Sequence, residues 1–152
     1  MLMPMPTIWD EGARNALIAR FAKLTPGARA QWGKMNAGQM VRHCAIGLDM
    51  LVGAAKVAPR PGALRIPFVR YMIVHWLPWP KGAPTGAELI TTGYQGDWDR
   101  DVAALRKSFE TVVARGEGGS FSEHAAFGNL SGKSVGVLVW RHLDHHLRQF
   151  GC

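Results

Sequence analysis

The sequence lacks the features that define several large classes of protein. It contains no run of about 18 apolar residues, the length that a membrane-spanning helix needs. Residues 1–6 have neither the basic start nor the apolar core of a secretory signal peptide. With only two cysteines, Cys44 and Cys152, the chain has no disulfide framework of the kind that stabilises small secreted domains. We therefore expect a cytoplasmic protein without a membrane partner.

Nucleic-acid-binding motifs are also missing, although the chain is basic. The 18 Lys and Arg residues outnumber the 11 Asp and Glu residues, which gives a formal net charge of +7. These basic residues are spread along the chain, with no run of four and no RNP, zinc-finger or basic-zipper pattern. We therefore expect no nucleic-acid partner, and the net charge alone leaves a basic binding module as a third hypothesis.

Length and composition predict one packed domain spanning residues 1–152. A globular chain of this size, with 47% hydrophobic and 19% charged residues, can bury roughly two thirds of its unfolded surface. Apolar residues recur with helical spacing in four segments. These segments run from a cap at Thr7 or Asp10 to about Leu24, from about Ala37 to Ala55 behind an Asn36 cap, from the Asp97–Asp101 acidic cluster to Arg115, and from Ser131 to Phe150.

Between residues 56 and 96 the chain contains six prolines and five glycines, which break up any long helix. Only Phe68–Leu77 can form a short apolar helix there, to pack over the other helices or line a pocket. The pattern therefore predicts an all-α protein, a four-helix bundle with a long crossover between its second and third helices. We expect Trp32, Tyr71, Trp76 and Trp79 to include residues that shape a pocket, because the crossover must cover one end of the bundle.

Three of the six histidines lie close together near the C-terminus. On a helix, His142 and His146 share one face, with Cβ atoms about 6 Å apart, so that two imidazoles can reach one metal ion at about 2.1 Å. His145 borders the same face. No HExxH motif is present, so a third ligand must come from another segment.

His43 is the best candidate for the third ligand. It lies on the apolar face of the second predicted helix, where an unpaired imidazole would be destabilising. A core histidine bonded to a carbonyl group is the alternative interpretation. Cys44 is soft enough to compete for zinc, but it lies about 100° further round the helix.

Four groups of residues, in chain order, resemble a known superfamily. They are Trp32-Gly-Lys-Met-x3-Gln39-Met-x2-His43, Pro84-Thr85-x2-Glu88, His124-x2-Phe127-Gly-x-Leu-Ser131 and His142-Leu-Asp-His-His-Leu-x-Gln149-Phe-Gly151. Over about residues 32–151 the chain resembles a branch of unknown function within the DinB-like superfamily, which includes the YfiT-like metal-dependent hydrolases. The C-terminal HLDHHLxQFG element is the most specific part. The segment 131–136 departs from the usual pattern, since it is rich in glycine and lacks the Trp and acidic residues of similar sequences.

The resemblance implies a four-helix bundle of the DinB/YfiT type that binds a divalent metal ion through His43, His142 and His146. It also implies a small-molecule substrate and a homodimer. Several relatives use a low-molecular-weight thiol, such as bacillithiol, mycothiol or glutathione, as cosubstrate.

Two functions follow from these expectations. The first is a metal-dependent enzyme, a thiol-dependent transferase or hydrolase, in which three histidines hold zinc or nickel and leave a position open for water or a thiol. His124 or His145 would then act as an acid or base, or be structural. The alternative is a non-catalytic metal-binding or stress-related structural protein, which a fourth ligand from Cys44 or His75 would favour.

Overall fold

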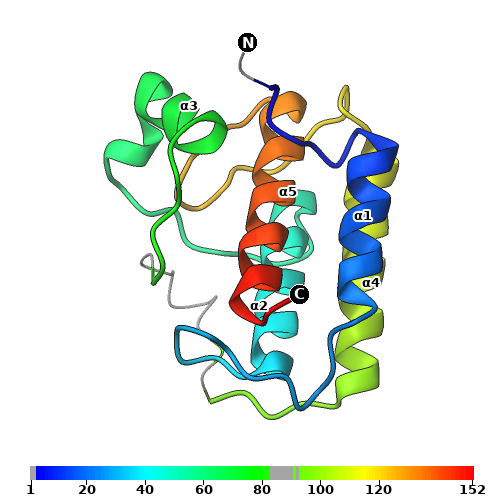
Figure 1. Cartoon of the computed structure of the whole chain (residues 1–152). Coiled ribbons are helices and arrows are strands. Elements are labelled where there is room, and N and C mark those ends of the chain that lie inside the picture. Colours follow the sequence, from blue (N-terminus) through cyan, green and yellow to red (C-terminus); the bar gives the residue numbers. More distant parts are fainter. Residues whose placement is uncertain (1–2, 83–90, 92) are drawn as a thin grey trace.

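The computed structural model describes residues 3–82, 91 and 93–152, and these residues form an all-helical protein (Figure 1). The elements are α1 (Glu11–Phe21), α2 (Ala37–Val52), the 3₁₀ turn η1 (Ala63–Arg65), α3 (Pro67–His75), α4 (Trp98–Arg115) and α5 (Gly132–Gln149). The described part has no β-strand, only an isolated antiparallel bridge between His124 and Gly128. The prediction of an all-α protein is confirmed. Pro84, Thr85 and Glu88 of the crossover lie outside the described residues.

Polar side chains cap the starts of the long helices. Asp10, rather than Thr7, caps α1, since its carboxylate accepts a hydrogen bond from the Ala13 N–H at 2.7 Å. At the start of α2, Asn36 and Gln39 each accept a hydrogen bond from the other's backbone N–H at 2.9 Å, forming a capping box. This box fixes the register of the helix that carries His43.

Three predicted helix ends need correction. Helix α1 ends at Phe21 rather than about Leu24, and α2 ends at Val52 rather than Ala55. Gly53 stops α2, because its φ of 80° is a left-handed conformation that favours glycine. The short crossover helix α3 ends at His75 instead of Leu77.

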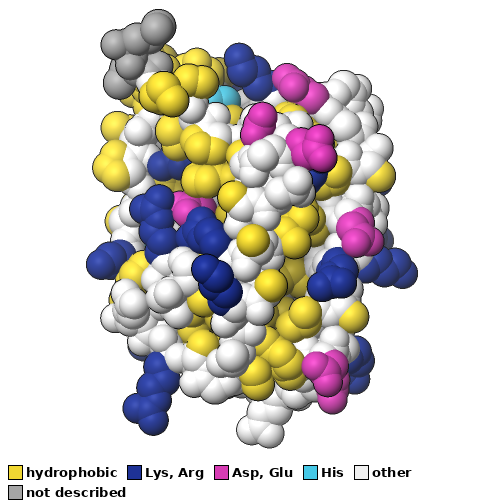
Figure 2. Space-filling view, turned by 45° about the vertical axis from the view of Figure 1, so that its right-hand side comes forward, with side chains coloured by type: hydrophobic (Ala, Val, Ile, Leu, Met, Phe, Trp, Pro, Cys, Tyr) yellow, Lys and Arg dark blue, Asp and Glu magenta, His cyan; other side chains and the backbone are white. Residues whose placement is uncertain are grey.

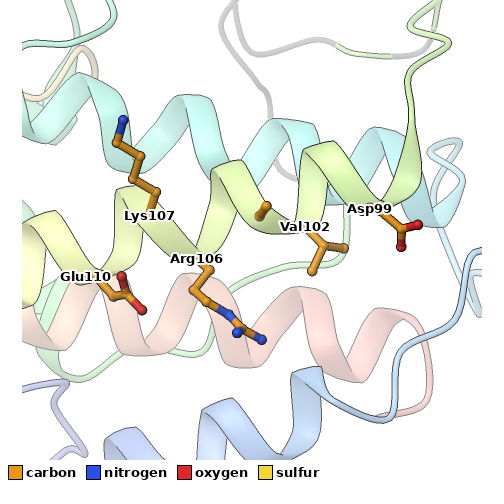
Figure 3. A pocket seen from close by; sticks show the side chains of 6 residues that line it. Asp99, Val102, Arg106, Lys107 and Glu110 are labelled. Atoms are coloured by element: carbon orange, nitrogen blue, oxygen red, sulfur yellow. The ribbon is translucent and has the colours of Figure 1, made fainter.

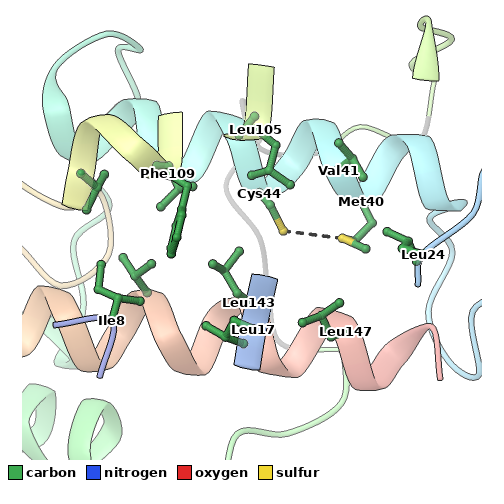
Figure 4. Packing of buried hydrophobic residues seen from close by; sticks show 14 of the residues in the cluster. Ile8, Leu17, Leu24, Met40, Val41, Cys44, Leu105, Phe109, Leu143 and Leu147 are labelled. Carbon is green, nitrogen blue, oxygen red and sulfur yellow. Dashed lines mark hydrogen bonds between the residues drawn. The ribbon is translucent and has the colours of Figure 1, made fainter. Parts of the chain in front are cut away.

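Helix α5 packs against α1, α2 and α3, and α2 packs lengthwise against α4. Figure 4 shows the main apolar core, in which side chains from α2, α4 and α5 point toward one another. Ile8 and Leu17 close this core from the N-terminal segment and α1. The Ile8 N–H donates to the carbonyl of Gly136, and a Cβ on Gly136 would collide with Trp9. Because Gly136 has no side chain, the N-terminal segment can pack directly against the first part of α5.

Figure 2 shows both charge signs on one face: several Lys and Arg side chains gather on its left half, and most of the Asp and Glu side chains lie at its upper centre and right. Among the described helices, none combines the length and the apolar character that a membrane span requires. Several large apolar side chains of α3 and its flanks are exposed, among them Phe68 and Tyr71. Because it carries acidic as well as basic side chains, the face in Figure 2 is not a basic surface of one charge sign.

Candidate metal centre

Helices α2 and α5 bring three imidazole rings together. His43 Nε2 lies 3.0 Å from His142 Nε2, although the two residues are 99 positions apart in the chain. His142 Nε2 lies 3.1 Å from His146 Nε2. One ring nitrogen from each of the three residues lies within 4.8 Å of the other two. Two nitrogens bound to a tetrahedral zinc ion at about 2.1 Å are about 3.4 Å apart, so small ring movements would let these rings hold one ion.

The tautomer of His146 is set by Gln149, which follows one helical turn later. The Gln149 amide Nε2 donates to the Trp32 carbonyl at 2.8 Å, and a carbonyl can only accept. The Gln149 Oε1 therefore faces His146, where it accepts from Nδ1–H at 2.7 Å. With its proton on Nδ1, a neutral His146 presents a lone pair on Nε2, the nitrogen that faces His142.

Burial keeps two of the three rings neutral. Burial, followed by the nearby His43, lowers the pKa of His146 to about 3 against the opposing hydrogen bond from Gln149. Burial, and then His146 and His43, lower the pKa of His142 well below its usual value. Neutral imidazole is the form that binds a metal ion, so both rings are ready to bind at pH 7 without losing a proton.

Two other residues considered as ligands lie elsewhere. Cys44 is fully buried in the apolar core, where its Sγ lies 3.6 Å from the Met40 Sδ and burial raises its pKa well above the ordinary value (Figure 4). His75 stacks on Tyr71 and hydrogen-bonds the Ser134 hydroxyl at 3.0 Å. In the described part of the chain, neither residue belongs to the histidine group.

His124 has a structural role. Its Nδ1 accepts hydrogen bonds from the N–H groups of Ala126 and Phe127 at 3.1 and 3.2 Å, in the loop before α5. Burial, with help from Arg60 and Arg65, lowers its pKa to about 4, so this imidazole is neutral. His124 therefore orders a turn, and it is not part of the three-histidine group.

His145 lies outside the group of three but next to it, with its ring centre 5.2 Å from that of His146. On its other side it borders a groove of about 490 Å³ that Trp32 and Trp79 also line. The prediction that aromatic residues of this set shape a pocket is thus confirmed for Trp32 and Trp79. Tyr71 and Trp76, the other two residues of the set, are about half exposed on and after α3 and are not among the described residues that line the groove.

A second depression lies on α4 alone and contains none of the histidines (Figure 3). Arg106 and Lys107 are among the side chains that line it. The described residues that line it all come from one helix, so they offer no groups from distant segments that converge on a ligand.

Gln149 belongs to the C-terminal motif, but reasoning from the sequence gave it no role beside His146. Its position three residues after His146 was the available signal, since side chains at that spacing meet on a helix. Its second partner, the Trp32 carbonyl, could not be identified without the fold.

Fold and site together define an all-helical protein with a three-histidine candidate metal centre. Residues 11–151 match the family described as protein of unknown function (DUF1569), and the chain belongs to this family. No curated protein and no solved structure matches the chain significantly.

Proposed function

We propose that His43, His142 and His146 bind one divalent metal ion, zinc or nickel, and that the protein is a metal-dependent enzyme. The observation that carries this proposal is the convergence of three imidazole nitrogens from two helices at 3.0 and 3.1 Å. The lowered pKa values of His142 and His146 and the fixed tautomer of His146 add to it, because they match what a metal ligand requires.

Catalysis is favoured over a purely structural role by the number of ligands. Catalytic zinc sites have three protein ligands and an open fourth position, whereas structural sites are closed by four. Among the described residues, the group has three members, and Cys44 and His75, the two considered as a fourth ligand, are engaged in the core and with Ser134. A bound ion with an open position supplies Lewis-acid chemistry, which lowers the pKa of water or of a thiol.

The reaction class we propose is that of a thiol-dependent transferase or a hydrolase acting on a small molecule. It follows from the resemblance to the DinB-like superfamily, in which one histidine from the second bundle helix and an HxxxH pair from the fourth bind the metal. In this chain α1, α2, α4 and α5 would be the four helices of the bundle, with α3 in the crossover. His43 on α2 and the pair on α5 have the chain order that this assignment requires.

Metal analysis of the purified protein tests the proposal. After chelation and reconstitution with zinc or nickel, we expect about one ion per chain in the parent and almost none in His142→Ala or His146→Ala. His145→Ala is the matched control, since it removes an adjacent imidazole that is outside the group of three. Full metal retention in both ligand variants would refute the site.

X-ray absorption at the metal edge separates the two functions. Three nitrogen ligands and one exchangeable light atom support an enzyme, and transfer of glutathione to an electrophile such as chlorodinitrobenzene then tests the thiol reaction. Four protein ligands would instead favour the alternative, a non-catalytic metal-binding or stress-related structural protein.

A further inference from the structure

The groove beside His145 has walls made of groups that metal binding does not use. Three are indole rings and three are cationic side chains: Trp32, Trp79, Trp140, Lys81, Arg141 and Arg148. Indole faces stack on flat apolar groups, and Lys and Arg bind negatively charged oxygen atoms. The groove thus combines a surface for an aromatic ring with groups that attract an anion.

Asp144 is the one carboxylate among the described residues of the groove, and it is already paired. Its Oδ1 lies 2.7 Å from Arg20 and its Oδ2 lies 2.6 Å from Arg148. Neither Lys81 nor Arg141 forms an ion pair with a described residue. Among the described residues that line the groove, cationic side chains are therefore in excess of carboxylates.

Arg141 is held in place without being neutralised. Its Nη1 donates to the carbonyls of Ile73 and Val74 at 2.7 and 2.8 Å. Its Nη2 donates to the Leu77 carbonyl at 2.5 Å, and its guanidinium carbon lies 4.8 Å from the centre of the Trp79 ring. Because these partners are uncharged, they fix the orientation of the guanidinium and leave its charge available. A cation fixed in advance binds an anion with a smaller loss of side-chain entropy.

The third indole, that of Trp140, has a donor without an acceptor. Its Nε1–H is buried and has no hydrogen-bond partner within the described residues. Such unpaired buried donors are rare in native proteins. Trp140 lines the groove with other parts of its ring, because its Nε1 has almost no accessible surface.

His145 connects the groove to the three histidines. Its ring centre lies 5.7 Å from that of Trp32 and 6.3 Å from that of Trp79, on the groove side. On the other side it lies 5.2 Å from that of His146. A molecule bound in the groove is therefore separated from a metal ligand by one imidazole ring.

We propose that this groove binds an aromatic ring bearing an anionic oxygen group, a carboxylate or a phosphate, and that such aromatic acids are the substrate class of the neighbouring metal centre. The assignment of aromatic acids as substrates rests on the proposed function, whereas binding of such an acid in the groove does not. The Lys81 ammonium lies 4.5 Å over the Trp32 ring and the Arg141 guanidinium 4.8 Å over the Trp79 ring, so a ligand ring would stack on the indole surface that these cations leave uncovered. The excess of cationic side chains over the one carboxylate accounts for the acid.

The test measures the binding of three probes to the full-length protein by calorimetry, with and without reconstituted zinc. The probes are 2-naphthoate, 2-naphthyl phosphate and the uncharged 2-naphthamide. We expect at least one acid to bind about tenfold more tightly than the amide, with or without zinc. The double variant Lys81→Gln/Arg148→Gln should remove most of this preference. Both side chains are exposed, and Arg20 continues to pair with Asp144, so the variant should fold.

The matched control is Arg106→Gln/Lys107→Gln, which removes the same charge from the depression on α4 (Figure 3). It should leave binding of every probe unchanged. Equal affinity for acids and amide, or an equal loss in both double variants, overturns the groove proposal. Binding that needs zinc and ignores Lys81 and Arg148 also overturns it, because the acid is then a metal ligand. Zinc-independent binding of an acid by a protein that fails to bind metal would reject the proposed function and keep the groove as an aromatic-acid site.

Discussion

Replacement of Gln149 tests whether the tautomer of His146 controls metal binding. Gln149 is 4% exposed, and its amide connects the His146 Nδ1–H to the Trp32 carbonyl through bonds of 2.7 and 2.8 Å. In Gln149→Leu, a side chain of similar size fills the same space but accepts and donates nothing. His146 is then free to change tautomer and to rotate.

The size of the effect follows from these two bonds. Loss of the outer partner of a metal-binding histidine typically lowers metal affinity by about 10- to 100-fold. The His146 N–H and the Trp32 carbonyl also lose their partners, and each unpaired buried group costs about 1–3 kcal/mol. We therefore expect Gln149→Leu to lower the free energy of unfolding by about 2–6 kcal/mol, even without metal.

Gln149→Glu separates the two roles. A carboxylate still accepts from the His146 Nδ1–H, but it cannot donate to the Trp32 carbonyl. We expect zinc affinity close to that of the parent together with a clear loss of stability. Competition with a chromophoric chelator measures the affinity, and urea denaturation of the apo protein measures the stability. If Gln149→Leu binds zinc as tightly as the parent, the argument from the tautomer is refuted.

Four further predictions concern stability, pH and the backbone near the site. Zinc at several hundred times its dissociation constant should raise the free energy of unfolding by about 3–4 kcal/mol, seen as a higher melting temperature in calorimetry; no rise at pH 7.5 would contradict a shared site. Histidines with ordinary pKa values would become protonated and lose the metal below about pH 6. In this fold the pKa of His146 is lowered to about 3 and that of His142 well below its usual value. We therefore expect most of the zinc-induced rise to persist at about pH 5.5. His124 has a pKa lowered to about 4 in the fold, so the unfolded chain takes up its proton first as pH falls from about 6.5. Between about pH 6.5 and pH 4 the free energy of unfolding therefore falls by about 1.4 kcal/mol per pH unit. In His124→Asn this pH dependence should be smaller by the contribution of one proton, which urea denaturation at several pH values measures. In Gly33→Ala the added Cβ would lie 2.6 Å from the Gln149 Nε2, at a backbone φ of 82° that favours glycine. We expect this variant to bind zinc more weakly, as Gln149→Leu does. Unchanged zinc affinity would show that Gln149 can move away.

The sequence was sufficient for the elements whose signals are local. Helical spacing of apolar residues located α2 and α5, and Asn36 was recognised as a cap because its effect is confined to the first turn. The HxxxH pair was recognised for the same reason, since four residues on one helix fix the separation of His142 and His146. The helix ends were placed less well: Gly53 ends α2 earlier than the apolar pattern suggested.

Features that depend on distant segments were harder to predict. His43 could be proposed as a third ligand from its place on an apolar helix face, but its approach to His142 depends on how α2 and α5 pack. Tyr71 and Trp76 were grouped with Trp79 by their position in the crossover. The structure separates them, because α3 presents Tyr71 to the exterior while Trp79 follows the helix and stacks beside Arg141.

Two of the elements that carried the resemblance, the Trp32-Gly element and the C-terminal one, meet at one place, and this gives their residues a physical reason. Gly33, in the Trp32-Gly element, has a φ of 82° and leaves the space that the Gln149 amide occupies. The neighbouring Gln31 N–H donates to the Gln149 carbonyl at 2.7 Å, so the loop is fixed to the last turn of α5 by side chain and backbone alike. Trp32 thereby serves twice, with its carbonyl orienting Gln149 toward His146 and its indole forming a wall of the groove. A change in this loop should therefore alter His146 and the groove together, as our proposal of a substrate site beside a metal centre requires.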